Sequence, residues 1–130
     1  MNPDHANLAA ANVLILEDDY YLATDLQQVL EQAGATVVGP FPDVEGASQS
    51  LGDARPDCAF VDVNLGDGPS FEVPSALTRL AIPFAFVTGY DAGTIPSEFD
   101  TVVRLEKPVN ARDVTRVALD MLGRSDVAPA

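Results

Sequence analysis

Cys58-Ala59-Phe60-Val61-Asp62 is the stretch of this sequence that decides the fold. Four apolar residues in a row are followed at once by an aspartate. A short run that is apolar on both faces is typical of a strand buried inside a parallel sheet, because side chains of a strand alternate between two faces and both must be covered. The stretch therefore predicts a central strand over residues 58–61 that presents Asp62 at its carboxyl end.

Apolar runs of the same kind occur on both sides of this stretch, and each stops at a polar or turn-forming residue. Segments with helical spacing separate them, so strands and helices alternate along the chain. Such alternation predicts an α/β domain with a parallel sheet that is covered by helices on both faces. The other four expected strands are residues 13–16, 36–38 (ended by Gly39-Pro40), 83–87 and 102–105.

The helix signals differ in strength from one segment to the next. We expect Asp19 to be an N-terminal charge or N-cap of the first helix rather than a metal ligand. Asp43 and Asn110 are good N-caps for the second and the last helix. Residues 70–80 are more weakly helical, with Pro74 in the first turns. Residues 91–100 contain Gly93 and Pro96, so we expect the helix between the fourth and fifth strands to be short or irregular. The first helix has its apolar face at Leu22, Leu26, Val29 and Leu30, and it is followed by Gly34.

Composition limits the class of protein. The 130 residues include seven basic and twenty acidic side chains, for a formal net charge of −13. This charge argues against direct binding of nucleic acid and of anionic membranes, which both require basic patches. The single cysteine, Cys58, excludes an internal disulfide, and no signal peptide or membrane span is recognised, so we expect a cytoplasmic protein. A monomer is a separate expectation that does not follow from these observations. We expect a flexible arm over residues 1–11, one domain over 12–123 and a flexible tail over 124–130.

Polar residues gather where the expected strands end. Glu17 and Asp18 follow the first strand, Asp62 the third, Thr88 the fourth and Lys107 the fifth. In open parallel sheets, ligands bind outside the carboxyl ends of the strands. These five side chains should therefore converge at one edge of the sheet.

The chemistry of such an edge is restricted by its charges. Three carboxylates within a few ångströms repel one another, and a hard divalent cation such as Mg²⁺ relieves the repulsion. A lysine can neutralise a phosphoryl oxygen, and a threonine hydroxyl can hydrogen-bond another. One carboxylate can then act as a nucleophile and form an aspartyl phosphate.

In these residues the chain resembles the receiver domains of two-component response regulators, over roughly residues 11–123. The motifs are Glu17-Asp18, Asp62-Val63-Asn64-Leu65, Thr88-Gly89 and Lys107-Pro108. The resemblance implies a (βα)5 flavodoxin-like fold with strand order 2-1-3-4-5. It implies Asp62 as the phosphoacceptor, aided by Thr88 and Lys107, and a histidine kinase or histidine phosphotransfer protein as the donor. It also implies Mg²⁺ bound by Glu17, Asp18, Asp62 and the backbone carbonyl of Asn64.

Residues 83–90 are similar to the signature of the FAT GUY subgroup, mostly stand-alone receivers of alphaproteobacteria that act in phosphorelays or stress signalling. Receivers usually carry an aromatic switch residue three positions before the lysine, where this chain has Arg104. Arg104, Gly89 and Tyr90 are therefore candidates for switching or for control of the phosphorylated lifetime. We also expect Asp19, Tyr20 and Ala23 to be exposed on the first helix and to contact the donor.

Three functions remain to be compared. The first is a stand-alone receiver that signals by contact with an unknown downstream protein, or that serves as a relay intermediate or phosphate sink. The second is a degenerate receiver that binds partners independently of phosphorylation, against which the intact set of site residues argues. The third is an aspartyl-phosphate phosphatase, which needs a second aspartate two residues after the nucleophile. Asn64 occupies that position, so we expect no enzyme activity beyond self-phosphorylation and self-dephosphorylation.

Overall fold

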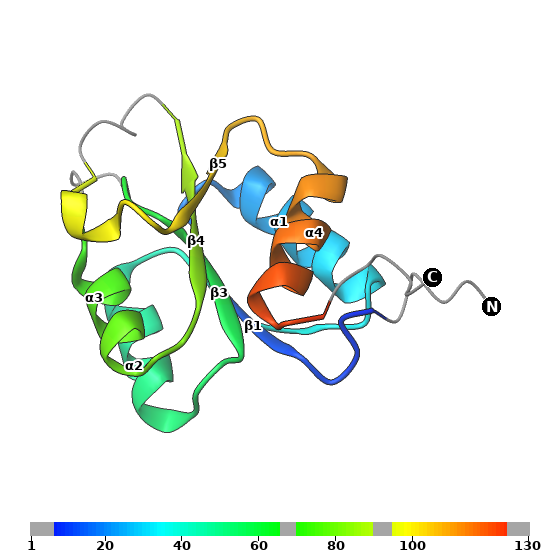
Figure 1. Ribbon diagram of the computed structural model, residues 1–130, viewed down its shortest axis with the longest axis horizontal. Helices are drawn as coiled ribbons and strands as arrows, with labels where there is room; N and C mark the ends of the chain where they lie inside the picture. The colour runs from blue at the N-terminus through cyan, green and yellow to red at the C-terminus, as the bar shows by residue number, and fades with distance from the viewer. Residues whose placement is uncertain (1–6, 66–69, 90–94, 125–130) are drawn as a thin grey trace.

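The computed structural model describes residues 7–65, 70–89 and 95–124. Its centre is a five-stranded parallel sheet with the strand order β2-β1-β3-β4-β5 (Figure 1). This topology confirms the flavodoxin-like fold with order 2-1-3-4-5. The strands are β1 (Asn12–Leu16), β2 (Thr36–Phe41), β3 (Cys58–Asp62), β4 (Phe84–Thr88) and β5 (Val103–Glu106).

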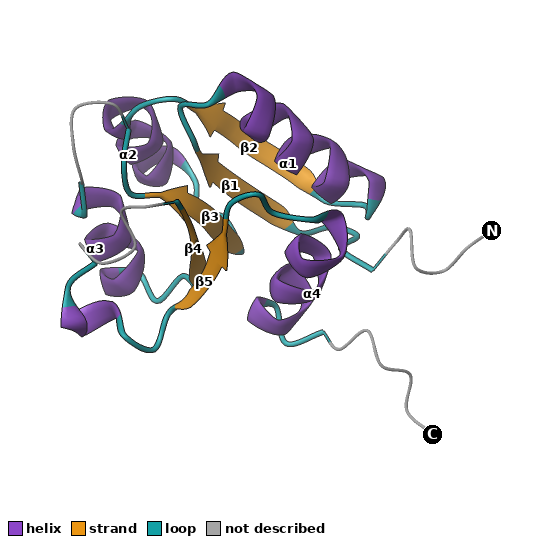
Figure 2. Cartoon of the chain, turned by 90° about the horizontal axis from the view of Figure 1, so that it is seen from above, coloured by secondary structure: helices purple, strands orange, loops and turns teal. Residues whose placement is uncertain are grey.

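Helices cover both faces of the sheet, as the alternating pattern predicts. Helices α1 (Tyr20–Gln32) and α4 (Ala111–Met121) lie on one face, and α2 (Val44–Asp53) and α3 (Glu72–Arg79) lie on the other (Figure 2). Every residue of β3 and β4 is buried, because both strands are sandwiched between these two helical layers. The central strand that carries Asp62 is thus fixed by packing on both sides.

Three of the helices begin at the expected capping residues. Asp19 accepts hydrogen bonds from the amides of Tyr21 and Leu22, at 3.0 and 3.2 Å. Asp43 and Asn110 cap α2 and α4 by accepting from the backbone amides three residues later. These caps satisfy amides that have no partner inside the first turn of a helix.

The connection between β4 and β5 contains a 3₁₀ helix, η3 (Ser97–Phe99), and no α-helix in its described part, residues 95–102. This confirms the expectation of a short or irregular helix. The turn is closed by hydrogen bonds from the Phe99 amide to the Pro96 carbonyl and from the Val102 amide to the Phe99 carbonyl, both 3.0 Å.

Two details of the fold differ from the expectation. Strand β2 does not end at Gly39-Pro40 but continues to Phe41, with an irregularity in its pairing with β1 between Leu14 and Leu16. Strand β2 lies at the edge of the sheet and has no neighbouring strand on its outer side. Pro40, which has no amide proton, therefore loses no hydrogen bond to a neighbouring strand on that side.

The second difference concerns the segment before β1. Leu8 and Ala11 are fully buried in the core against α1 and α4, and the Leu8 amide donates to the Ala33 carbonyl. Arg124 donates to the carbonyls of Asn7 and Ala9. Leu8 and Ala11 are therefore part of the core, although they lie in the stretch expected as a flexible arm, while Ala9 and Ala10 between them are exposed. No helix in the described part of the chain has the length and apolar character needed to span a bilayer.

Candidate functional site

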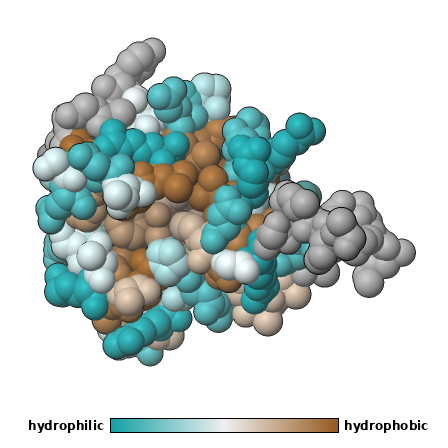
Figure 3. Space-filling view, viewed as in Figure 1, coloured by the Kyte–Doolittle hydropathy of each residue, from teal (hydrophilic) through white to brown (hydrophobic). Residues whose placement is uncertain are grey.

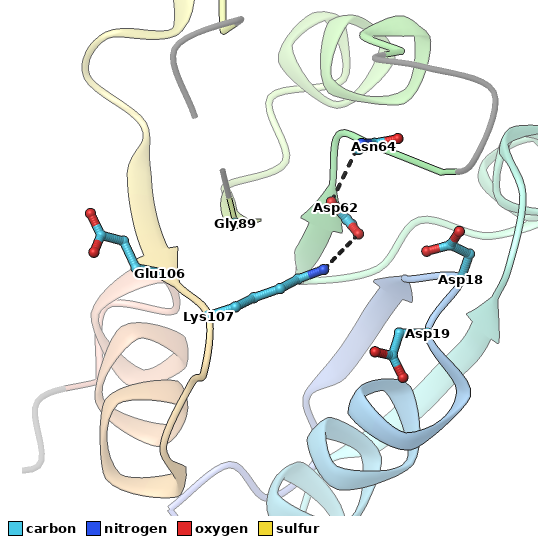
Figure 4. A pocket seen from close by; sticks show the side chains of 7 residues that line it. All are labelled: Asp18, Asp19, Asp62, Asn64, Gly89, Glu106 and Lys107. Atoms are coloured by element: carbon cyan, nitrogen blue, oxygen red, sulfur yellow. Dashed lines mark hydrogen bonds and ion pairs between the residues drawn. The ribbon is translucent and has the colours of Figure 1, made fainter. Parts of the chain in front are cut away.

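An open pocket of about 790 Å³ lies at the carboxyl edge of the sheet, where the expected residues converge. Figure 4 shows Asp62 in the middle, with Lys107 reaching toward it from the end of β5 and Asp18 on the opposite side, after β1. The lining residues are Asp18, Asp19, Asp62, Asn64, Gly89, Glu106 and Lys107.

Asp62 is held at the centre of the pocket by two hydrogen bonds. Its Oδ2 accepts from Lys107 Nζ at 3.0 Å, and its Oδ1 accepts from the Asn64 amide at 3.1 Å. The residue is only 1% exposed, so the packed strand limits its movement while the pocket leaves an approach from solvent. The side chain therefore has a fixed orientation toward an incoming group.

Glu17 is buried beneath the pocket. Its Oε2 accepts from the Asp19 amide at 3.0 Å, and its Oε1 lies 3.3 Å from Lys107 Nζ in an ion pair. Oε1 is nevertheless inaccessible to solvent and has no hydrogen bond among the described residues. Burial, and then contact with the Asp62 carboxyl, raises the pKa of Glu17 to about 8.

Lys107 bridges the two buried carboxyl groups. Its partial burial would lower its pKa, but the hydrogen bond with Asp62 and the charges of Glu17 and Asp62 outweigh that effect and raise it. The ammonium group is therefore charged throughout the physiological range. It offsets part of the repulsion between Glu17 and Asp62 and brings a positive charge to the pocket.

Three carboxyl groups lie close enough together to hold a cation. Oxygen atoms of Glu17, Asp18 and Asp62 all lie within 4.8 Å of one another, and Asp18 is exposed while the other two are buried. Oε1 of Glu17 is buried, has no hydrogen bond among the described residues, and has Lys107 Nζ at 3.3 Å as its charged neighbour, so it has a lone pair available to a cation or to water. The donor set fits Mg²⁺, which prefers carboxylate oxygens and keeps part of its water shell.

Thr88 lies at the end of β4, beside the strand that carries Asp62. The residue is fully buried, and its Oγ1 has no hydrogen bond among the described residues. Its backbone carbonyl accepts from the Lys107 amide at 2.7 Å, which fixes the start of the lysine loop. A buried hydroxyl without a partner costs free energy, so it has a driving force to bond any oxygen that arrives within reach.

The remaining candidates are placed differently. Gly89 lines the pocket, and Tyr90 lies outside the described residues. Arg104 does not line the pocket; it is an exposed β5 residue whose guanidinium lies 3.9 Å from the Asp100 carboxylate.

Two lining residues, Asp19 and Glu106, were not expected as site residues, although each directly adjoins one. Asp19 acts as the helix cap that the sequence favoured, and the Glu106 carboxylate points away from Asp62 (Figure 4).

The donor-contact residues expected on α1 need one correction. Tyr20 is 74% exposed and so is free to contact another protein, but Ala23 is buried. The neighbouring Tyr21 is 80% exposed, and the two rings contact each other edge to face. The buried face of α1 is Ala23, Leu26 and Leu30, with Leu22 only partly buried. The face of α1 that packs on the core is therefore slightly different from the expected one. It includes Ala23, and Leu22 lies at the margin of the apolar stripe.

Comparisons with known proteins agree with this arrangement. The family described as response regulator receiver domain matches residues 13–118. The sensory transduction protein LytT of Bacillus cereus is 29% identical over 108 residues, which are 80% of this chain and 44% of LytT. The phyllosphere-induced regulator PhyR of Methylorubrum extorquens is 28% identical over 117 residues, which are 85% of this chain and 44% of PhyR. The chain thus spans less than half the length of these two relatives.

A solved structure shows the same fold over a similar length. The solution structure of SdrG from Sphingomonas melonis Fr1 is 36% identical in sequence and superposes with a TM-score of 0.75. The match covers 86% of this chain and 95% of SdrG.

Proposed function

Because the chain belongs to the response regulator receiver domain family, we propose that it accepts a phosphoryl group from a phosphohistidine onto Asp62 in a Mg²⁺-dependent reaction. Membership of this family places the chain in two-component signalling. We propose in addition that Asp62 is the acceptor and that its neighbours have the roles described below. One observation carries it: Asp62 is buried, bonded to Lys107 and the Asn64 amide, and still open to the pocket.

The transfer follows from the placement of these groups. A carboxylate oxygen of Asp62 attacks the phosphorus, an O–P bond forms, the N–P bond of the phosphohistidine breaks, and the released imidazole takes up a proton. Lys107 Nζ supports the charge on a phosphoryl oxygen, and the Thr88 hydroxyl donates to another. Little covalent chemistry is required of the other residues, because catalysis of phosphoryl transfer is mostly positioning and charge stabilisation.

Asp18, Asp62, Glu17 and the backbone carbonyl of Asn64 would hold Mg²⁺ in this proposal. The ion would supply charge neutralisation for the phosphoryl oxygens and for the carboxylates. Asp18 is exposed at the pocket, whereas one oxygen of Glu17 already accepts from the Asp19 amide. We therefore assign the direct contact to Asp18 and a contact through water to Glu17.

The proposed setting is a stand-alone receiver of the FAT GUY kind, acting as a cytoplasmic monomer. The likeness to SdrG, nearly all of whose length is matched, supports a stand-alone receiver, and the segment 83–90 supports the subgroup. The donor is a histidine kinase or a histidine phosphotransfer protein. The phosphorylated domain contacts a downstream protein, or passes the phosphoryl group on in a relay. In this proposal the protein does not turn over an external substrate and does not contact nucleic acid directly.

Transfer from a phosphorylated donor tests the proposal. The protein is incubated with autophosphorylated histidine kinases and Mg²⁺, and label on the receiver is followed over time, with Asp62→Asn as the control. We expect rapid, stoichiometric labelling that the control lacks. A degenerate receiver would bind its partners without being labelled by any histidine or small-molecule phosphodonor, and label on the Asp62→Asn protein would place the acceptor elsewhere.

A further inference from the structure

Glu106 is an exposed residue at the rim of the pocket that takes no part in the proposed chemistry. It is the last residue of β5, opposite Thr88 in the pairing of β4 with β5, and it lines the pocket. Its side chain points away from Asp62 and Lys107 (Figure 4), and its carboxylate makes no hydrogen bond or ion pair with another described residue. An exposed carboxylate carries a full negative charge at neutral pH.

The other carboxylates that line the pocket differ from Glu106, because each has a group that offsets its charge. Asp19 accepts hydrogen bonds from two backbone amides at the start of α1, where the helix end carries partial positive charge. Asp62 accepts from Lys107. Asp18 and Asp62 are ligands of Mg²⁺ in the proposed function. Once the ion is bound, Glu106 is the lining residue whose negative charge remains without compensation among the described residues.

Such a charge changes the concentration of other ions at the pocket. A rim of one sign lowers the local concentration of ions of the same sign, and the effect grows with their charge. The surface around this end of the sheet is mainly hydrophilic on the face that Figure 3 shows, so charge rather than apolar contact governs what approaches it.

Two kinds of phosphodonor would meet this field differently. A small acyl phosphate such as acetyl phosphate is a dianion at neutral pH and reaches the pocket by diffusion alone. A phosphohistidine is carried by a protein, and contacts on other surfaces, such as the one expected at Tyr20, hold it in place. The charge of Glu106 therefore weighs more heavily on the small donor than on the protein donor.

We propose that Glu106 selects the phosphodonor, because its charge slows phosphorylation of Asp62 by small anionic acyl phosphates and spares transfer from a protein-borne phosphohistidine. The inference rests on the proposed function and adds a specificity-determining residue to it. With either donor, a carboxylate oxygen of Asp62 forms the new O–P bond. With acetyl phosphate, the bond between phosphorus and the acetate oxygen breaks, and acetate leaves with the electron pair. Glu106 contacts neither reacting group and acts through its field.

Phosphorylation by acetyl phosphate at two ionic strengths tests the inference. At an ionic strength of about 0.01 M, a unit charge about 10 Å from a dianion in water changes the local concentration of the dianion by about threefold. We therefore expect Glu106→Gln to be phosphorylated about three times faster than the wild type, and Glu106→Lys about nine times faster because the change in charge is doubled. At about 1 M salt the screening length is about 3 Å, so both gains should disappear.

The charge of the donor supplies a second readout, which a structural role of Glu106 would not produce. Phosphoramidate is a monoanion at neutral pH, so the gain of Glu106→Lys should be about threefold instead of about ninefold. Transfer from an autophosphorylated histidine kinase should not rise. Glu31→Lys is the matched control, because Glu31 is exposed and lies in the last turn of α1, the end away from the pocket. It makes the same change in charge and should give no gain.

The possible outcomes separate this inference from the proposed function. The inference is overturned if the Glu106 variants match the wild type with acetyl phosphate, if their gain persists in high salt or is equal for the two small donors, or if Glu31→Lys gains as much. An equal rise in transfer from the kinase overturns the selectivity. If the kinase labels the wild type in any of these cases, the proposed function stands. Absence of label on Asp62 with every donor overturns the proposed function and the inference with it.

Discussion

Replacing Asp62 with asparagine should stabilise the metal-free protein at alkaline pH, even though it removes an ion pair. The side chain keeps its shape, and its amide oxygen can still accept from the Asn64 backbone, as Oδ1 of Asp62 does at 3.1 Å. The hydrogen bond between Lys107 and Asp62 loses its charge on one side, which costs about 1 kcal/mol. At pH 6 we therefore expect the variant to be slightly less stable than the wild type.

The opposing effect comes from Glu17. Its pKa of about 8 in the folded protein exceeds the ordinary glutamate value of 4.5, so between these two pH values the folded state binds a proton that the unfolded state has lost. Stability therefore falls as pH rises from 4.5 through 8, by about 5 kcal/mol in all. Carboxylate oxygens of Glu17 and Asp62 lie within 4.8 Å, and two charges at that distance repel by about 3.5 kcal/mol at an effective dielectric constant of 20. Replacing Asp62 with asparagine removes this repulsion between the two carboxylates, and it does so only at pH values at which Glu17 is ionised.

Urea unfolding in the presence of a chelator, from pH 6 to pH 9, measures the difference. We expect the two stability curves to cross between these limits, with Asp62→Asn more stable by roughly 2 kcal/mol at pH 9 once the loss at Lys107 is subtracted. Excess Mg²⁺ should reduce the decline of the wild type with pH. Parallel curves for the two proteins would refute the reasoning, since they would mean that the Asp62 carboxylate does not raise the pKa of Glu17.

Three further outcomes test the site and its surroundings. Mg²⁺ should be required for labelling of Asp62 and should raise the stability of the folded protein by mass action. Asp18→Asn should weaken the labelling and the stabilisation by Mg²⁺ more than Asp25→Asn, a control at an exposed aspartate. Labelling undiminished in excess chelator would contradict this. Tyr20→Ala should slow transfer from a kinase by about tenfold, as expected for an aromatic contact worth about 1.4 kcal/mol, yet spare phosphorylation by a small-molecule donor; equal loss with both donors would assign Tyr20 to the site itself. Tyr90→Ala should shorten the half-life of the phosphorylated state if the bulky ring shields it from water, and an unchanged or longer half-life would count against that role.

The positions and type of the strands along the chain were available from the sequence because the pattern is local, whereas their order in the sheet came from the resemblance to the receiver family. Buried parallel strands must be apolar on both faces, so the runs ending at Leu16, Asp62 and Thr88 could be recognised one at a time. The side chains that cap helices are local as well, and Asp19, Asp43 and Asn110 act as expected. Since parallel strands present their carboxyl ends at one edge, the convergence of Asp18, Asp62 and Lys107 followed from the same local pattern.

Features that depend on distant partners were decided only by the tertiary structure. Leu8 is buried because α1 and α4 lie above it, and no periodicity in residues 1–11 indicates those partners. The raised pKa of Glu17 depends on burial and on Asp62, which lies 45 residues away.

The contacts of Phe99 with Phe71, Phe84 and Phe86 likewise join three elements that the sequence separates. A sequence specifies each element through neighbours along the chain. The charge, burial and packing of one side chain are set by whatever the fold brings next to it, and these properties became known only with the folded structure.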